Sequence, residues 1–116
     1  MGLTGTRGDA AERLAAAYLE LLGRVVVARN VRIAGVEVDL VTRDADVTAI
    51  VEVKYRSRSD FGGAAGAIDA GKRERLKRAA RAIASEGNSA VRVDVIALDH
   101  EPDGLRLRYV RNAIVE

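Results

Sequence analysis

The stretch EVDLVTRDADVTAIVEVK, residues 37–54, contains two segments rich in β-branched side chains that are joined by a short polar turn. Side chains at alternate positions of a strand lie on the same face. Glu37 and Asp39 therefore share a face of the first strand, and Glu52 and Lys54 share a face of the second. Carboxylates are costly in strands that pack a core, so this pattern requires an explanation.

The turn predicts the register of the two strands. With Ala45-Asp46 as a two-residue turn, counting back along both strands places Asp39 opposite Glu52 and Glu37 opposite Lys54. Directly opposed side chains have Cβ atoms roughly 4.5–5.5 Å apart, which is close enough for two carboxylates to share one cation. Two like charges at this distance repel unless something neutralises them. Mg²⁺, or Mn²⁺ in its place, is typically held by one or two protein carboxylates.

The alternative interpretation is an exposed ladder of acid–lysine pairs, which composition alone favours. Two features count against it. The segment VTAIVEVKY around Glu52 is strongly apolar, as expected of a central strand. Lys54 is also one of only three lysines, with Lys72 and Lys77, among nineteen basic residues, so its position is one where arginine was not used.

Two other segments have the periodicity of amphipathic helices. Residues 9–22 are expected to bury one side, and residues 67–86 are expected to bury another. Residues 1–8 have no periodicity and are expected to form a loose leader. The apolar side of the first helix is Leu14, Tyr18, Leu21 and Leu22, and that of the second is Ile68, Leu76, Ala79, Ala80 and Ile83.

The order of elements predicts the fold class. Strands are expected at residues 24–33, 36–43, 47–55, 90–99 and 105–110. The first three strands can pair antiparallel, and the helix over 67–86 then carries the chain across so that the fourth strand runs parallel to the third. We expect one α/β domain over residues 1–116, with a central mixed five-stranded sheet flanked by two main helices.

Composition excludes several classes of site. The chain of 116 residues has no cysteine and one histidine, which rules out disulfides, thiolate metal sites and zinc sites built on several histidines. No apolar run approaches the roughly 20 residues of a membrane span, and the N-terminus lacks a secretion signal. The sequence therefore predicts a cytoplasmic protein with no membrane partner.

Basic residues are concentrated after the acidic strands. A run of charge on a helix is usually a solvated face. Here it follows the carboxylates directly, which favours a polyanion held by its phosphates. Aromatic residues make up only 3% of the chain, so base stacking is a minor option. The predicted nucleic-acid-binding residues are Arg56, Arg58, Lys72, Arg73, Lys77, Arg78 and Arg81.

Asp39 followed by Glu52-x-Lys54 resembles the core of the PD-(D/E)xK nuclease superfamily. The segments GDAAERLAAAYL, ARNVRIAGVEVDLV, IVEVKYRSRSDFG and VRVDVIAL resemble, in order, the YraN family of small bacterial proteins within it, over roughly residues 8–99. The resemblance implies a restriction-endonuclease-like fold and Mg²⁺-dependent hydrolysis of phosphodiester bonds, with DNA as the expected partner. Asp39 and Glu52 would hold the metal, and Lys54 would orient water or stabilise the transition state.

Three further acidic residues have predicted roles. The resemblance, which extends to archaeal Holliday-junction resolvases, implies that Glu12 is a third metal-side carboxylate. The alternative is that Asp9-x-x-Glu12 is a capping box with Asp9 at the N-cap. Glu37 is expected to support the site or pair with Lys54, and Asp94 is expected to make a structural polar contact.

Two other functional classes are open at this point. The first is a nuclease fold that binds branched or single-stranded DNA or RNA without cutting it, and the second is a structural protein with surface charge ladders. Three carboxylates near phosphate favour the enzyme, because a protein that only binds DNA gains nothing from them. Cutting two strands of a junction needs two sites, so the analogy with resolvases admits a homodimer.

Overall fold

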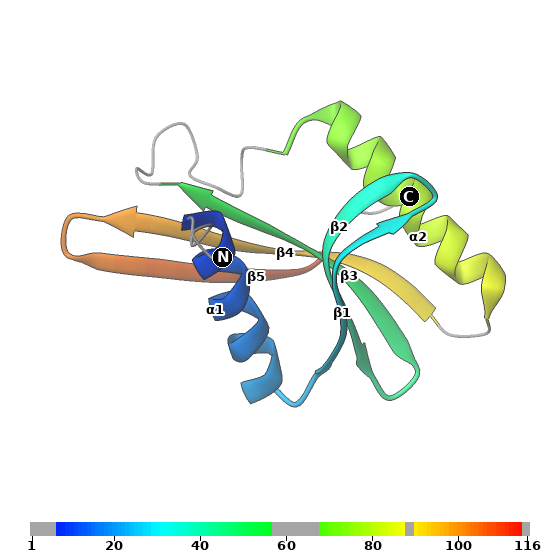
Figure 1. Ribbon diagram of the computed structural model, residues 1–116, viewed down its shortest axis with the longest axis horizontal. Coiled ribbons are helices and arrows are strands. Elements are labelled where there is room, and N and C mark those ends of the chain that lie inside the picture. The colour runs from blue at the N-terminus through cyan, green and yellow to red at the C-terminus, as the bar shows by residue number, and fades with distance from the viewer. Residues whose placement is uncertain (1–6, 57–67, 88–89, 115–116) are drawn as a thin grey trace, which may run out of the picture.

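The computed structural model describes residues 7–56, 68–87 and 90–114, which form five strands and two helices (Figure 1). The elements are α1 (Arg7–Leu21), β1 (Val25–Ile33), β2 (Val36–Asp44), β3 (Val47–Arg56), α2 (Ala70–Glu86), β4 (Ala90–Glu101) and β5 (Gly104–Ile114). The strands lie in sequence order in one sheet. All neighbours pair antiparallel except β3 and β4, which are parallel. This mixed sheet confirms the predicted α/β class and is compatible with a restriction-endonuclease-like arrangement.

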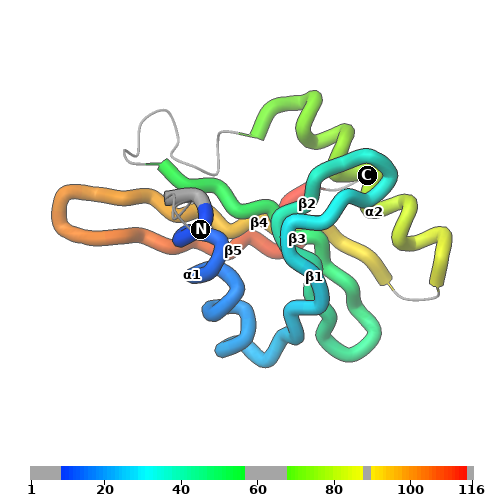
Figure 2. Tube along the Cα trace, in the orientation of Figure 1, coloured from blue at the N-terminus to red at the C-terminus, as the bar shows by residue number. Residues whose placement is uncertain are grey.

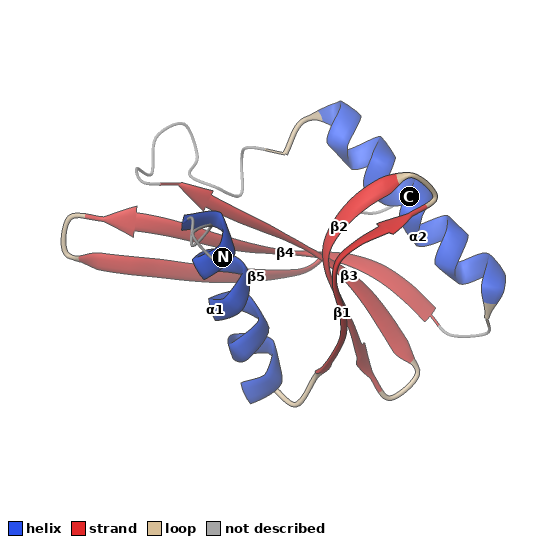
Figure 3. Cartoon of the chain, in the orientation of Figure 1, coloured by secondary structure: helices blue, strands red, loops and turns tan. Residues whose placement is uncertain are grey.

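A hydrophobic core lies on each side of the sheet, because each helix covers a different face (Figure 3). Strands β3 and β4 are buried on both faces, which explains why their sequences are nearly continuous apolar runs. The α2 side is the one predicted from sequence, with Leu76 and Ala79 fully buried and Ile68, Ala80 and Ile83 partly buried. The α1-side core includes Leu40, Val51, Ile96 and Leu98.

The predicted apolar side of helix α1 is only partly right, because Tyr18 packs against the core but the three predicted leucines are exposed. Leu14, Leu21 and Leu22 are 42%, 85% and 47% exposed. A second stripe with the same helical spacing faces the sheet instead, and it consists of Ala11, Ala15, Ala16 and Leu19. Small side chains let the helix lie close to a sheet face that already carries the rings of Tyr55 and Tyr109.

Both helices begin at residues other than those predicted. Helix α1 begins at Arg7, so two residues of the expected leader are helical and Asp9 lies in the first turn. The capping-box interpretation of Asp9 is therefore wrong. Helix α2 begins at Ala70, after the N-cap Asp69, whose Oδ1 accepts a hydrogen bond from the backbone nitrogen of Lys72 at 2.7 Å. None of the described helices has the length and apolar character needed to cross a bilayer.

The β1–β2 hairpin turns over near its middle. Val38 packs in the α2-side core and Leu40 in the α1-side core, although side chains two positions apart share a face in a flat strand. Asn30, opposite this point on β1, has a positive φ of 48°. The outer half of the hairpin consequently curves over towards α2 (Figure 2). Asp39 lies between the two halves.

Candidate metal and nucleic-acid site

The β2–β3 ladder follows the predicted register and then stops. It runs from Asp44 opposite Val47 to Leu40 opposite Val51. The ladder pairs predicted next, Asp39 with Glu52 and Glu37 with Lys54, are not formed. Because the hairpin curves away here, the Asp39 side chain takes over the role of a main-chain acceptor, and its Oδ2 accepts a hydrogen bond from the Val53 backbone nitrogen at 2.8 Å.

Glu52 is buried in the middle of β3, with only 3% of its surface exposed. The Nζ atoms of Lys54 and Lys72 each lie 3.3 Å from its Oε2. Its Oε1 is buried and has no hydrogen-bond partner among the described residues. Two ammonium groups thus share one carboxylate oxygen, while the other is left without a donor.

Burial raises the pKa of Glu52, and the nearby carboxylate of Asp39 raises it further, whereas Lys72 and Lys54 act in the opposite direction. Burial and Asp39 also raise the pKa of Glu12, against a hydrogen bond with the Asn30 side chain. Asp39 is therefore close to both glutamates. We call Glu12, Asp39 and Glu52 the acidic group.

The side chains at this site come from both sides of the sheet. Glu12 comes from α1, which covers one face, and Lys72 comes from α2, which covers the other. They approach the same place because β2 separates from β3 at Asp39. The end of the ladder thus creates a position where groups from both helices reach the strands.

The carboxylates of this group are few for a metal site built from protein ligands alone. Among residues 7–56, 68–87 and 90–114, no three His, Cys, Asp or Glu side chains are placed to hold one ion. Magnesium requires only one or two protein carboxylates, with water and substrate oxygens completing its shell. Asp39 and Glu52 fit that smaller set, since Glu52 has a buried oxygen that receives no hydrogen bond from the described part of the chain. The metal role of Glu12 stays a prediction.

Glu37 lies at the rim of the group. It is exposed, pairs with Arg32 in the β1–β2 ladder, and is the weakest contributor to the raised pKa of Glu12. The predicted contact between Glu37 and Lys54 is replaced by the Lys54–Glu52 ion pair.

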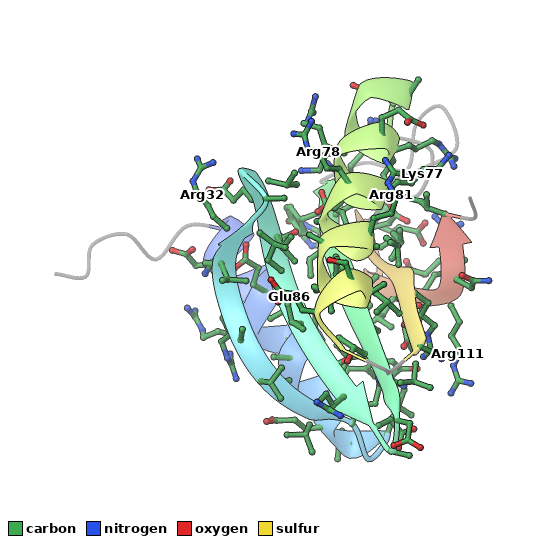
Figure 4. The ribbon with its side chains drawn as sticks, turned by 90° about the vertical axis from the view of Figure 1, so that its right-hand side faces the viewer. Arg32, Lys77, Arg78, Arg81, Glu86 and Arg111 are labelled. Carbon is green, nitrogen blue, oxygen red and sulfur yellow. The ribbon has the colours of Figure 1, made fainter. Side chains whose placement is uncertain are left out.

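The predicted nucleic-acid-binding residues divide into two sets. Lys72 points into the acidic group, whereas Arg73, Arg78 and Arg81 are exposed along α2. Figure 4 shows Lys77 and Arg81 on the side of α2 towards β5, and Arg78 on the side towards the β1–β2 hairpin. Lys77 also forms an ion pair with Glu74 at 3.2 Å. Arg56 is half-buried at the end of β3, and Arg58 lies outside the described residues.

Comparison with known proteins identifies the family. A model of the uncharacterised protein family UPF0102, the YraN family, matches residues 11–98. The chain belongs to this family. It is 43% identical to a UPF0102 protein of Halorhodospira halophila, over 95% of this chain and 88% of the relative. It is 45% identical to a Burkholderia pseudomallei member, over 91% of this chain and 73% of the relative. The family description assigns no activity, so the case for a function rests on the site.

Two contacts of this UPF0102 site were not predicted from the sequence. One is the ion pair of Lys72 with Glu52, and the other is the hydrogen bond of Asn30 with Glu12. A signal for Lys72 was present, because it is one of three lysines and follows the capping residue Asp69 by three positions. No pattern marks Asn30, because its role depends on how the hairpin turns over.

Asp94 has the structural role that was predicted for it. Its side chain is fully buried and accepts hydrogen bonds from Arg92, the Tyr109 hydroxyl and the backbone nitrogen of Asn112. Asn112 has a positive φ of 50° at an irregularity of β5. Asp94 therefore stabilises a bulge in the sheet.

Proposed function

We propose that this protein binds nucleic acid, with DNA as the preferred partner, and hydrolyses phosphodiester bonds with Mg²⁺ or Mn²⁺. The observation that carries the proposal is Glu52, a buried carboxylate with an oxygen that no described residue donates to, close to a second carboxylate, Asp39. Leaving such a group unsatisfied costs free energy that a purely structural residue has no reason to retain. A divalent cation would satisfy this oxygen and relieve the repulsion between the two carboxylates.

Each residue of the site has a role in this chemistry. Asp39 and Glu52 would hold the ion, which when bound neutralises phosphate charge and lowers the pKa of water. Lys54 and Lys72 bring two positive charges to the same place, where they attract a phosphate and stabilise charge that develops on it. The Asp39 carboxylate is kept in position by the Val53 backbone nitrogen.

A second candidate is a nucleic-acid-binding module that does not cut. Two lysines already neutralise Glu52, and no group of three ligands is present in the described part of the chain. Both observations favour binding without a metal. The surface-ladder interpretation, by contrast, is wrong for Glu52, because that residue is buried.

The test is a cleavage assay of the purified protein on linear, nicked, flapped and four-way DNA with Mg²⁺ or Mn²⁺. We expect cleavage by the wild type and none by Glu52→Gln or Asp39→Asn, because each loses a metal ligand. Asp46→Asn, an exposed change in the β2–β3 turn, is the matched control and should cut normally. No cleavage by the wild type on any substrate, together with tight binding, would support the binding module instead.

Calorimetric titration with the same ions separates metal binding from catalysis. Heat of binding should be present in the wild type and Asp46→Asn and absent in Asp39→Asn. A cytoplasmic location is part of the same proposal, because that is where the DNA of a bacterium lies. On a branched substrate that is cut in two strands, a homodimer is the expected species.

A further inference from the structure

Two adjoining cavities lie between helix α2 and the end of the sheet formed by β4 and β5. One has a volume of about 150 Å³ and is lined by Arg73, Val95 and Ala113 among others. The other has a volume of about 100 Å³ and is lined by Lys77, Val93 and others. Ile114 of β5 lines both, so the two cavities adjoin at this residue, and we refer to the pair as the groove.

The α2 wall of this groove is basic. Arg73 and Lys77 line the cavities, and Arg81 continues the same stripe at the next four-residue interval. Successive members are about 6 Å apart along the helix axis. Lys77 and Arg81 lie on the side of α2 towards β5 (Figure 4). One acid of α2, Glu74, pairs with Lys77 as an exposed ion pair, which is weak. The wall is thus complementary to a polyanion.

The groove lies next to the candidate site, because two of its lining residues are immediate neighbours of site residues. Val95, which lines the groove, is the β4 register partner of Glu52. Arg73, on its wall, directly follows Lys72, which contacts Glu52. A strand bound in the groove would therefore lie next to the carboxylates.

We infer, on the basis of the proposed function, that this groove binds one unpaired nucleic-acid strand leading away from the cleaved bond. The two cavities are far too small for a duplex but large enough to accept parts of individual nucleotides. The cations would bind successive phosphates, and the more accessible apolar residues of the larger cavity, Val110 and Ala113, would contact bases or sugars. The substrate class is accordingly a flap, overhang or splayed junction rather than a continuous duplex.

The test measures fluorescence anisotropy of labelled oligothymidylate and of a blunt duplex, in buffer with a chelator so that no metal-dependent cleavage occurs. The triple variant Arg73→Gln, Lys77→Gln, Arg81→Gln removes the stripe. The control Arg13→Gln, Arg29→Gln, Arg43→Gln removes the same charge from exposed positions on α1, β1 and β2. We expect the stripe variant to lose about tenfold or more in affinity for the single strand and much less for the duplex. The control should retain the wild-type preference.

A second variant tests the larger cavity without changing charge. Ala113→Phe places a ring in the larger cavity and should weaken single-strand binding several-fold while duplex binding and the thermal midpoint are unchanged. Three outcomes would overturn the inference. The stripe variant could lose affinity for the single strand and the duplex equally, or Ala113→Phe could leave single-strand binding unchanged. An acidic peptide could also displace the bound single strand as well as an unlabelled strand does. If the wild type cleaves but does not prefer single strands, the inference about the groove is wrong and the proposed hydrolysis stands. If it prefers single strands but does not cleave, the proposed hydrolysis is wrong and the groove inference stands.

Discussion

Asp94 on β4 and Glu52 on β3 are both buried, but their surroundings differ. Each oxygen of Asp94 accepts hydrogen bonds, from the Arg92 Nε at 2.9 and 3.2 Å, the Tyr109 hydroxyl at 2.5 Å and the Asn112 nitrogen at 2.9 Å. Glu52 has two ammonium groups at 3.3 Å on one oxygen and no donor on the other within the described residues. A buried carboxylate is tolerated in the native state when it is fully satisfied, so Asp94 is accounted for by folding alone.

The environment of Glu52 is not accounted for in the same way. Asp39 lies close enough to raise its pKa, whereas Asp94 is surrounded by donors. Burial by itself therefore does not separate a structural acid from a candidate functional one. What separates them is whether every oxygen has a partner, and the following substitutions test that distinction.

The largest expected effect on stability is that of Asp94→Ala. Removing this carboxylate leaves the guanidinium of Arg92, the Tyr109 hydroxyl and the Asn112 nitrogen without their acceptor. We expect a loss of about 3–5 kcal/mol in the free energy of unfolding, measured by urea denaturation. Asp103→Ala, an exposed change in the turn of the same hairpin, should stay within about 0.5 kcal/mol of wild type. A loss below about 1 kcal/mol in Asp94→Ala would show that the Asp94 carboxylate does not stabilise the fold as its hydrogen bonds indicate.

Lys54→Arg tests the proposed functional role of the groups around Glu52. If Lys54 only neutralises Glu52, an arginine should serve as well, because it keeps the charge. If Lys54 places a compact ammonium at a phosphate, the wider guanidinium will be displaced, and misplacement by about 1 Å can cost on the order of 10²-fold in rate. We expect the cleavage rate to fall by that factor while nucleic-acid and metal affinities are retained. Unimpaired cleavage would show that Lys54 is only a counterion.

Tyr109→Phe should remove one donor from Asp94 and cost about 1–3 kcal/mol at neutral pH. Burial raises the pKa of Tyr109 above its usual 10.0, and the hydrogen bond to Asp94 raises it further. The folded state therefore holds this proton more tightly than the unfolded state, so wild-type stability falls as pH rises from about 10 through the raised pKa.

Phenylalanine cannot lose a proton, so the variant should lack that alkaline fall. Urea denaturation at neutral and alkaline pH measures the difference. Tyr18→Phe is a suitable control, because Tyr18 packs edge-on against Tyr109 through its ring, which phenylalanine retains. A variant that falls as steeply as the wild type would assign the alkaline loss to another group.

The smallest expected effect is that of Glu52→Gln on stability in metal-free buffer. The change removes a buried charge and its repulsion with Asp39, while Lys54 and Lys72, which are 29% and 24% exposed, can turn to water. We expect the free energy of unfolding to rise or to change by less than about 1 kcal/mol. A loss comparable with that of Asp94→Ala would mean that Glu52 is a structural partner, and the proposed site would then be wrong.

Local patterns were enough to predict the architecture. The strand and helix periods identified every element, and the crossover through α2 predicted the parallel β3–β4 pair. The two-residue turn after Asp44 predicted the register as far as Leu40 and Val51, because a short hairpin transmits its register from the turn. The bounds differed by a few residues, mainly where the β4–β5 hairpin continues to Ile114.

The buried side of α1 could not be chosen from the sequence. The stripes that begin at Ala11 and Leu14 have the same spacing, and the larger side chains favoured the wrong one. The choice depends on how much room the sheet leaves, and that is a property of residues distant in the chain.

The sequence by itself identified the candidate site residues, because Asp39, Glu52 and Lys54 lie on strands whose pattern marks them. Only the tertiary structure decided how they meet. The hairpin twists away at Asp39, so a hydrogen bond to the Val53 backbone replaces the next ladder pair. Helix α2 then brings Lys72, twenty positions after Glu52, to the Glu52 oxygen that Lys54 already contacts. Both outcomes depend on sheet twist and helix placement, which the packing of the whole core sets and no local pattern encodes.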